Sequence, residues 1–127
     1  MSYLLIFIGA GIGGIIRFFC STLVQKMTGG WMFPLGTFAV NMIGCLIIGY
    51  LMQLSESRGV LQGDWRLFVF VGLLGGFTTF SSFGLETFYL LRDGEYIYAI
   101  ANAVGQVVLG LMLVWLGIVA ARLLHGG

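Results

Sequence analysis

The chain has 127 residues, of which 59% are hydrophobic and only 9% are charged, and its formal net charge is +1. Soluble domains carry about 25% charged residues, so this composition excludes a soluble globular protein, and a nearly neutral chain is not expected to bind nucleic acid. Spanning a lipid bilayer takes about 20 helical residues. Four apolar runs are long enough and predict an all-α, multi-pass membrane protein with a single transmembrane domain over residues 1–127: residues 3–24, 33–54, 67–91 and 96–121.

The first apolar run carries one charge, Arg17, about two-thirds of the way along. An ionisable residue inside a membrane span is a functional candidate by default. Because the arginine side chain is long enough to reach the headgroup region, we expect Arg17 to anchor the helix or to lie in an aqueous vestibule.

The sequence shows no nucleophile triad, Walker loop or histidine–cysteine metal motif, so we do not expect an enzyme.

The second run places Thr37, Asn41 and Gly44 at positions i, i+4 and i+7, on one helix face. An unpaired amide at membrane depth costs several kcal/mol, so Asn41 must have a partner. Two interpretations stay open at this point. The amide bonds a neighbouring helix as structural glue, or it donates to a passing ligand.

The third run contains the least helical segment of the chain, "GGFTTFSSFG" at residues 75–84. Glycines weaken a helix, and hydroxyl side chains that bond backbone carbonyls bend it. We therefore expect the third helix to be broken here, and its freed carbonyls to line water, to be buried or to coordinate a cation. The alternative is a continuous helix with back-bonded hydroxyls. The hydroxyl residues are Thr78, Thr79, Ser81 and Ser82.

Two phenylalanines of this segment, Phe80 and Phe83, are neighbours on one helix face. The edge of an aromatic ring is electropositive, so rings that point edge-on into a pore favour a small anion without trapping it. Glu86 lies near the end of the same run, where we expect a wet vestibule. In the fourth run, Asn102 and Gln106 form a second neutral polar stripe at i, i+4.

Short links between the runs carry most of the charges, and their distribution is nearly even. The side that holds both termini carries Arg58, Arg66 and Arg122, whereas the opposite side carries Lys26 and Arg92. Orientation follows an excess of basic residues on one side. With almost no excess, we predict insertion in both orientations. The alternative is that a slight bias fixes a single orientation.

Dual insertion lets two copies pair as an antiparallel homodimer about an axis in the membrane plane. Eight helices can enclose a polar path that four cannot. Small residues allow close helix contacts, and Gly9/Gly13 and Gly72/Gly76 form two G-x-x-x-G pairs.

Three stretches of the sequence resemble the Fluc (CrcB-type) family of fluoride channels: "GGIIRF" at 13–18, "GTFAVNMIGCLIIG" at 36–49 and "GLLGGFTTFSSFGLE" at 72–86. The resemblance runs the whole length of the chain. It implies a passive channel of the bacterial inner (plasma) membrane that exports cytoplasmic fluoride and so gives fluoride resistance. It also implies an antiparallel, dual-topology homodimer with two pores.

The resemblance further implies roles for individual residues. A structural sodium ion at the dimer centre would be held by backbone carbonyls of Gly75 and Thr78. The ion pathway would include the side chains at Asn41, Phe80 and Phe83, with Thr79, Ser81, Ser82 and Thr37 on the same polar track, and vestibule residues Arg17 and Glu86. Two positions depart from the family pattern. Phe18 stands where tyrosine is common, and Gln106 where a small hydroxyl residue is common.

The runner-up interpretation is a small multidrug-resistance-type, proton-coupled exporter, which also has four short helices. Such exporters use a membrane-embedded carboxylate, usually on the first helix, to exchange protons for a cationic drug. Here the first run carries Arg17 and no acid, and the embedded acid Glu86 lies near an end. A purely structural membrane subunit is the third interpretation. Assays of fluoride efflux and of proton-coupled organic-cation uptake separate the three.

Overall fold

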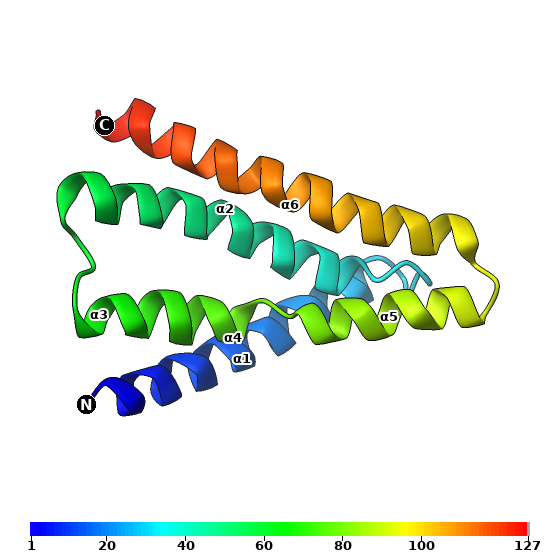
Figure 1. Cartoon of the computed structure of the whole chain (residues 1–127). Coiled ribbons are helices and arrows are strands. Elements are labelled where there is room, and N and C mark those ends of the chain that lie inside the picture. The colour runs from blue at the N-terminus through cyan, green and yellow to red at the C-terminus, as the bar shows by residue number, and fades with distance from the viewer. Residues whose placement is uncertain (127) are drawn as a thin grey trace.

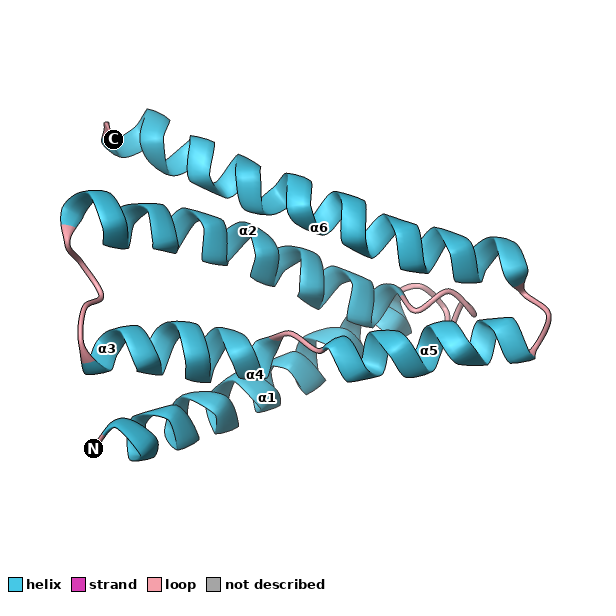
Figure 2. Cartoon of the chain, viewed as in Figure 1, coloured by secondary structure: helices cyan, strands magenta, loops and turns pink. Residues whose placement is uncertain are grey.

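The computed structural model describes residues 1–126 and shows helices and no strand in that range (Figures 1 and 2). Four helical segments are long and apolar enough to cross a membrane, so the prediction of an all-α, multi-pass membrane protein is confirmed. In chain order the elements are α1 (Ser2–Met27), α2 (Leu35–Arg58), α3 (Asp64–Arg66), η1 (Leu67–Leu74, π-helical), α4 (Gly75–Phe77), α5 (Phe80–Arg92) and α6 (Tyr96–His125). The third span consists of α3, η1, α4 and α5 in succession.

The helices run farther than the apolar runs that were used to predict them. The second run was expected over residues 33–54, but α2 begins after Pro34 and ends at Arg58. Its end is set by Gly59, which adopts a left-handed conformation with φ 69° that glycine accepts without a steric penalty. Hydropathy locates the part of a helix that lies in lipid, whereas capping residues decide where the helix stops.

The chain crosses back and forth so that both termini lie at one end of the molecule, together with the 59–63 link (Figure 1). The 28–34 and 93–95 links lie at the other end. α6 packs along α2, and α1 packs against η1 and α4. α1 also contacts α2 directly, and α5 packs against α6. In Figure 1 the third span runs below α2 and crosses α1.

Close helix contacts depend on glycine, as the sequence predicted. A Cβ atom added to Gly9 would lie 2.7 Å from the carbonyl oxygen of Phe68 and 3.2 Å from the Cα of Gly72. A Cβ at Gly49 would overlap the carbonyl of Val114, and one at Gly117 would lie 2.8 Å from the backbone nitrogen of Tyr50. Backbones at these crossings touch directly, which a larger residue would prevent.

The third span changes conformation in its middle. Thr78 (φ −96°, ψ 159°) and Thr79 (φ −149°, ψ 113°) have extended backbones and separate α4 from α5, visible as the loop-coloured stretch in Figure 2. This stretch faces α2, where the Thr78 side chain occupies the space that a Cβ at Gly44 would need. The absence of a side chain at Gly44 thus makes room for the extended residues.

Candidate site at the extended residues of the third span

Both ends of the Asn41 side-chain amide, on α2, form hydrogen bonds with the backbone of Thr79. Its Nδ2 donates to the Thr79 carbonyl oxygen at 3.1 Å, and its Oδ1 accepts from the Thr79 amide at 2.8 Å. Buried backbone groups need partners, and these two have left the helical pattern. In a continuous helix the Thr79 amide would donate to the carbonyl of Gly75. The side chain of Asn41 therefore replaces a helical neighbour.

The same Asn41 amide starts a chain of hydrogen bonds that crosses to α6 and returns to α5. Its Nδ2 also donates to Gln106 Oε1 at 2.7 Å, and Gln106 Nε2 donates to Asn102 Oδ1 at 3.0 Å. Asn102 Nδ2 then donates to Thr87 Oγ1 at 2.8 Å, and the Thr87 hydroxyl donates to the Phe83 carbonyl at 2.7 Å. Asn41 of the first polar stripe and both residues of the second, which the sequence showed separately, thus belong to one network.

A cavity of about 360 Å³ opens beside this network, and none of the residues that line it is charged. Its wall includes Asn41, Gln106, Phe80 and Phe83. The two phenylalanine rings pack with centroids 5.4 Å apart and planes tilted by 50°. Phe80 is 81% exposed on the single chain, so the cavity is open on that side.

The hydroxyl residues cluster at the first turn of α5. Thr79 Oγ1 accepts from the Ser82 amide at 3.1 Å and donates to Ser82 Oγ at 3.0 Å, while Ser81 Oγ lies 3.4 Å from Thr79 Oγ1. Thr79 is therefore the N-cap of α5. Of the residues predicted to share a polar track, Thr79 lines the cavity beside Phe80 and Phe83, and Ser81 and Ser82 adjoin it.

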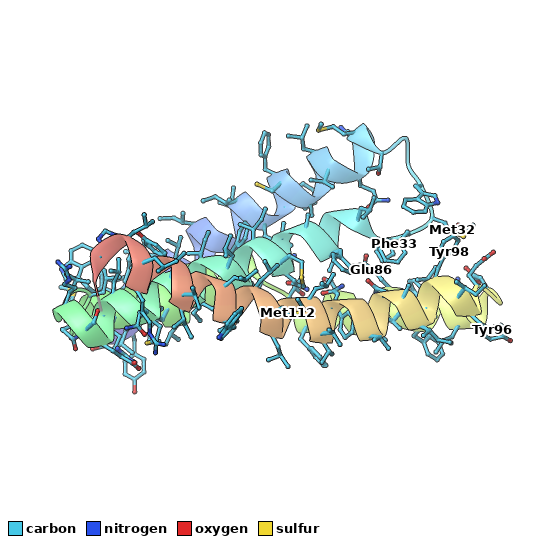
Figure 3. All side chains as sticks on the ribbon, turned by 90° about the horizontal axis from the view of Figure 1, so that it is seen from above. Met32, Phe33, Glu86, Tyr96, Tyr98 and Met112 are labelled. Atoms are coloured by element: carbon cyan, nitrogen blue, oxygen red, sulfur yellow. The ribbon has the colours of Figure 1, made fainter. Side chains whose placement is uncertain are left out.

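Thr37 and Glu86 meet at a different place. The Thr37 hydroxyl donates to a carboxylate oxygen of Glu86 at 2.6 Å, and both residues line a larger cavity of about 830 Å³ at the end of the 28–34 link. Figure 3 shows Glu86 near Phe33 and Tyr98 at this end. Thr37 is nearly buried, at 9% exposure. The structure thus separates Thr37 from the Asn41 cavity and places it with the predicted vestibule glutamate.

Arg17 and the two predicted sodium ligands lie close to the extended residues. The Arg17 Nε donates to the Gly76 carbonyl at 3.1 Å, so the side chain is held at the third span rather than extended along α1 to the headgroups. Gly75 is exposed and Thr78 is partly exposed on the single chain. The amides that would bond their carbonyls in a helix, those of Thr79 and Ser82, bond side chains instead.

The family is decided by comparison of the whole sequence. The family model described as CrcB-like protein, Camphor Resistance (CrcB), matches residues 4–118. The chain belongs to the CrcB-like family.

Several relatives of this CrcB-like chain carry the name fluoride-specific ion channel FluC. The protein of Methylobacillus flagellatus is 50% identical over 114 residues, which cover 90% of this chain and 89% of the relative. The protein of Methylocella silvestris is 48% identical and covers 95% of this chain and 93% of its own length. The protein of Pyrococcus abyssi is 42% identical, with 94% of each chain covered.

Three residues of this CrcB-like protein complete the network although they were not among the predicted site residues: Gln106, Asn102 and Thr87. The i, i+4 spacing of Asn102 and Gln106 showed that they share a face, but not that this face meets Asn41. Gln25 was also missed. Its Oε1 accepts from the Gly36 amide at 3.1 Å and its Nε2 donates to two carbonyls of the link, so it caps α2 just before Thr37.

Proposed function

We propose that this CrcB-like chain forms a passive, fluoride-selective channel that exports cytoplasmic fluoride. The observation that carries the proposal is the uncharged cavity beside the extended residues of the third span, whose lining includes two side-chain amides, two threonines and three phenylalanines. The choice of fluoride as the permeating ion rests on the relatives, which are named fluoride-specific ion channels. Neutral donors and ring edges attract a small anion, and the lack of a fixed charge lets it leave again.

We further propose that the extended pair Thr78–Thr79 is a functional break of the third helix, at which Asn41, Phe80, Phe83, Thr79, Ser81 and Ser82 form the ion pathway. A strongly hydrated anion needs directed N–H and O–H donors in place of water. The Asn41 amide and the hydroxyls at the start of α5 carry such N–H and O–H groups, of which those of Asn41 bond Thr79 and Gln106 and that of Thr79 bonds Ser82 in this structure. Thr37 and Glu86 belong to the vestibule at the larger cavity. The Arg17 guanidinium supplies positive charge beside the break.

An antiparallel homodimer with two pores is the assembly that this arrangement favours. Phe80, a pathway residue in this proposal, is 81% exposed on one chain, and the cavity beside it is open. A second copy in the opposite orientation closes both cavities by the same contact, because a two-fold axis relates them. The nearly even distribution of basic residues supports insertion in both orientations.

The backbone around the break fits a structural sodium ion. Backbone carbonyls are suitable ligands for a hard cation, and the carbonyls of Gly75 and Thr78 have lost the amides that would bond them in a helix. Two chains on one axis would bring four such oxygens together. A cation there would neutralise the carbonyl dipoles and join the two subunits.

Export in this proposal needs no coupled ion. Hydrogen fluoride enters from an acidic exterior and dissociates in a near-neutral cytoplasm. An inside-negative membrane potential then favours exit of the anion by about 2.3 kcal/mol per charge per 100 mV.

The decisive experiment measures ion flux from liposomes that contain the purified protein. We expect fluoride efflux, balanced by a potassium ionophore, without a proton or sodium gradient. The runner-up predicts instead that a proton gradient drives uptake of an organic cation, and a purely structural subunit predicts neither flux.

Two phenylalanine variants test the site in the same assay. We expect Phe80→Ile to lose most of the fluoride efflux. Phe7→Ile is the matched control, because Phe7 is 76% exposed on α1, far from the cavity residues in sequence. Equal rates for both variants and the unmodified protein would remove Phe80 from the pathway.

A further inference from the structure

The hydrogen-bond chain from Asn41 to Phe83 has a fixed direction at both of its ends. At one end the Thr79 backbone amide can only donate, and it requires the carbonyl oxygen of Asn41. At the other end the Phe83 backbone carbonyl can only accept, and it takes the hydroxyl proton of Thr87. Neither backbone group can reverse its role.

The fixed ends determine the orientation of each side-chain amide between them. Because the Thr87 proton is used on Phe83, the Thr87 oxygen must accept, so Asn102 presents its NH₂ group to Thr87 and its oxygen to Gln106. Gln106 must then donate to Asn102 and present its oxygen to Asn41. A flip of any one amide would set two donors or two acceptors against each other.

Burial makes this order costly to disturb. Asn102 is 0% exposed and Gln106 is 8% exposed, so neither amide can exchange its partner for bulk water. A buried donor without an acceptor carries its full desolvation penalty, and in a low-dielectric interior each bond of such a network strengthens the next.

We propose that Thr87, Asn102 and Gln106 are positioning residues that fix the second N–H of Asn41, the one that the Thr79 carbonyl does not hold, at the α6 wall of the cavity. This inference rests on the proposed fluoride pathway. If Gln106 were free, Asn41 would keep its pairing to Thr79, and with it its orientation, but would lose the bond that fixes its second N–H. Gln106 also lines the cavity, so a freed Gln106 amide would no longer present a fixed donor and acceptor to a passing anion.

The experiment disrupts the hydrogen-bond chain at Thr87, which does not line the cavity. Thr87→Val keeps the shape of the side chain and deletes both the acceptor for Asn102 and the donor to the Phe83 carbonyl. We expect fluoride efflux from liposomes to fall by about tenfold, in keeping with the loss of the Asn102 bond, which leaves a buried N–H without an acceptor. Thr87→Ser keeps the hydroxyl and should restore at least half of the rate. Thr28→Val is the matched control, because Thr28 also bonds a backbone carbonyl, that of Gln25, but lies outside the network.

Two results would overturn this positioning role: wild-type efflux in Thr87→Val, or loss of efflux in Thr87→Ser equal to that in Thr87→Val. A wild-type protein without fluoride efflux would instead refute the proposed function. The two failures are therefore distinguishable.

Discussion

Asn41 carries two tasks that the sequence posed as alternatives. Its amide satisfies both backbone groups of Thr79 and bonds Gln106, which is the structural task. The same amide lines the uncharged cavity, where an anion in the proposed pathway would meet it. In this structure the two Nδ2 hydrogens bond the Thr79 carbonyl and Gln106 Oε1, so in the proposed pathway an anion would meet Asn41 by taking the place of one of these acceptors.

At this scale we predict that Asn41→Asp slows fluoride efflux by at least about tenfold, which corresponds to about 1.4 kcal/mol in the barrier. A carboxylate still accepts from the Thr79 amide, but it opposes the Thr79 carbonyl, the Gln106 oxygen and the permeating anion. Efflux from liposomes measures the effect. Gln53→Glu, the same chemical change near the end of α2, is the control and should conduct normally; normal conduction in Asn41→Asp would contradict the assignment.

The elements are held together by direct backbone contact as much as by side chains. α2 and α6 approach at Gly49 and Gly117, and α1 approaches η1 and α4 at Gly9 and Gly76. In a membrane, helix association relies on such close packing because lipid is as apolar as the helices themselves. The third span is the irregular element: a π-helical segment precedes the extended pair, and π-helical turns are frequent at functional sites.

At the scale of elements we predict that Gly117→Ala destabilises the protein by about 1–3 kcal/mol, the usual range for overpacking. The added methyl group would overlap the Leu46 carbonyl and force α6 away from α2. Thermal unfolding in detergent measures the shift. Gly11→Ala on α1 has open space around its Cβ position and should melt like the unmodified protein. Equal melting temperatures for the two variants would show that the α2–α6 contact can accommodate an added methyl group.

For the whole molecule, the two ends of the bundle differ in which links they carry but hardly in basic charge. The termini and the 59–63 link share one end (Figure 1). That end carries Arg58, Arg66 and Arg122, and the opposite end carries Lys26 and Arg92. With basic residues so evenly distributed, the positive-inside rule favours neither orientation strongly.

We predict that reporters fused to the C-terminus of the unmodified chain give signals on both sides of the membrane. Removing two charges with Arg58→Ala and Arg122→Ala should leave an excess of basic residues at the opposite end, so the C-terminus should move mostly to the outside. Paired reporters, one active inside and one active outside, measure the ratio. A one-sided signal from the unmodified chain would exclude dual insertion.

The proposed sodium site predicts that the stability of the assembled dimer depends on sodium. Replacing sodium by N-methyl-D-glucamine at equal ionic strength should lower the melting temperature, because a ligand that binds only the folded state stabilises it, by about 2.7 kcal/mol at 100 times its Kd. Identical melting curves in the two buffers would remove sodium from the account.

Sequence patterns located the important residues but not their partners. Hydropathy identified four spans because lipid selects for apolar side chains over about 20 residues. The polar residues Asn41, Thr79 and Gln106 were each visible as exceptions within those spans. The i, i+4 spacings of Thr37 with Asn41 and of Asn102 with Gln106 gave a face on each of two helices, but spacing along one helix carries no information about which face of another helix it meets.

The sequence by itself determined that this is a four-span membrane protein with few charges inside its spans, because a chain of this length and composition is stable in a bilayer only as membrane-spanning helices. Only the tertiary structure decided that Asn41 replaces a helical neighbour of Thr79, that Thr37 belongs with Glu86, and that Thr87, Asn102 and Gln106 form one directed network. The reason is that a hydrogen bond between helices requires two side chains at the same depth and on facing surfaces. Glycine contacts and helix crossings set that depth and facing, and no single segment encodes them.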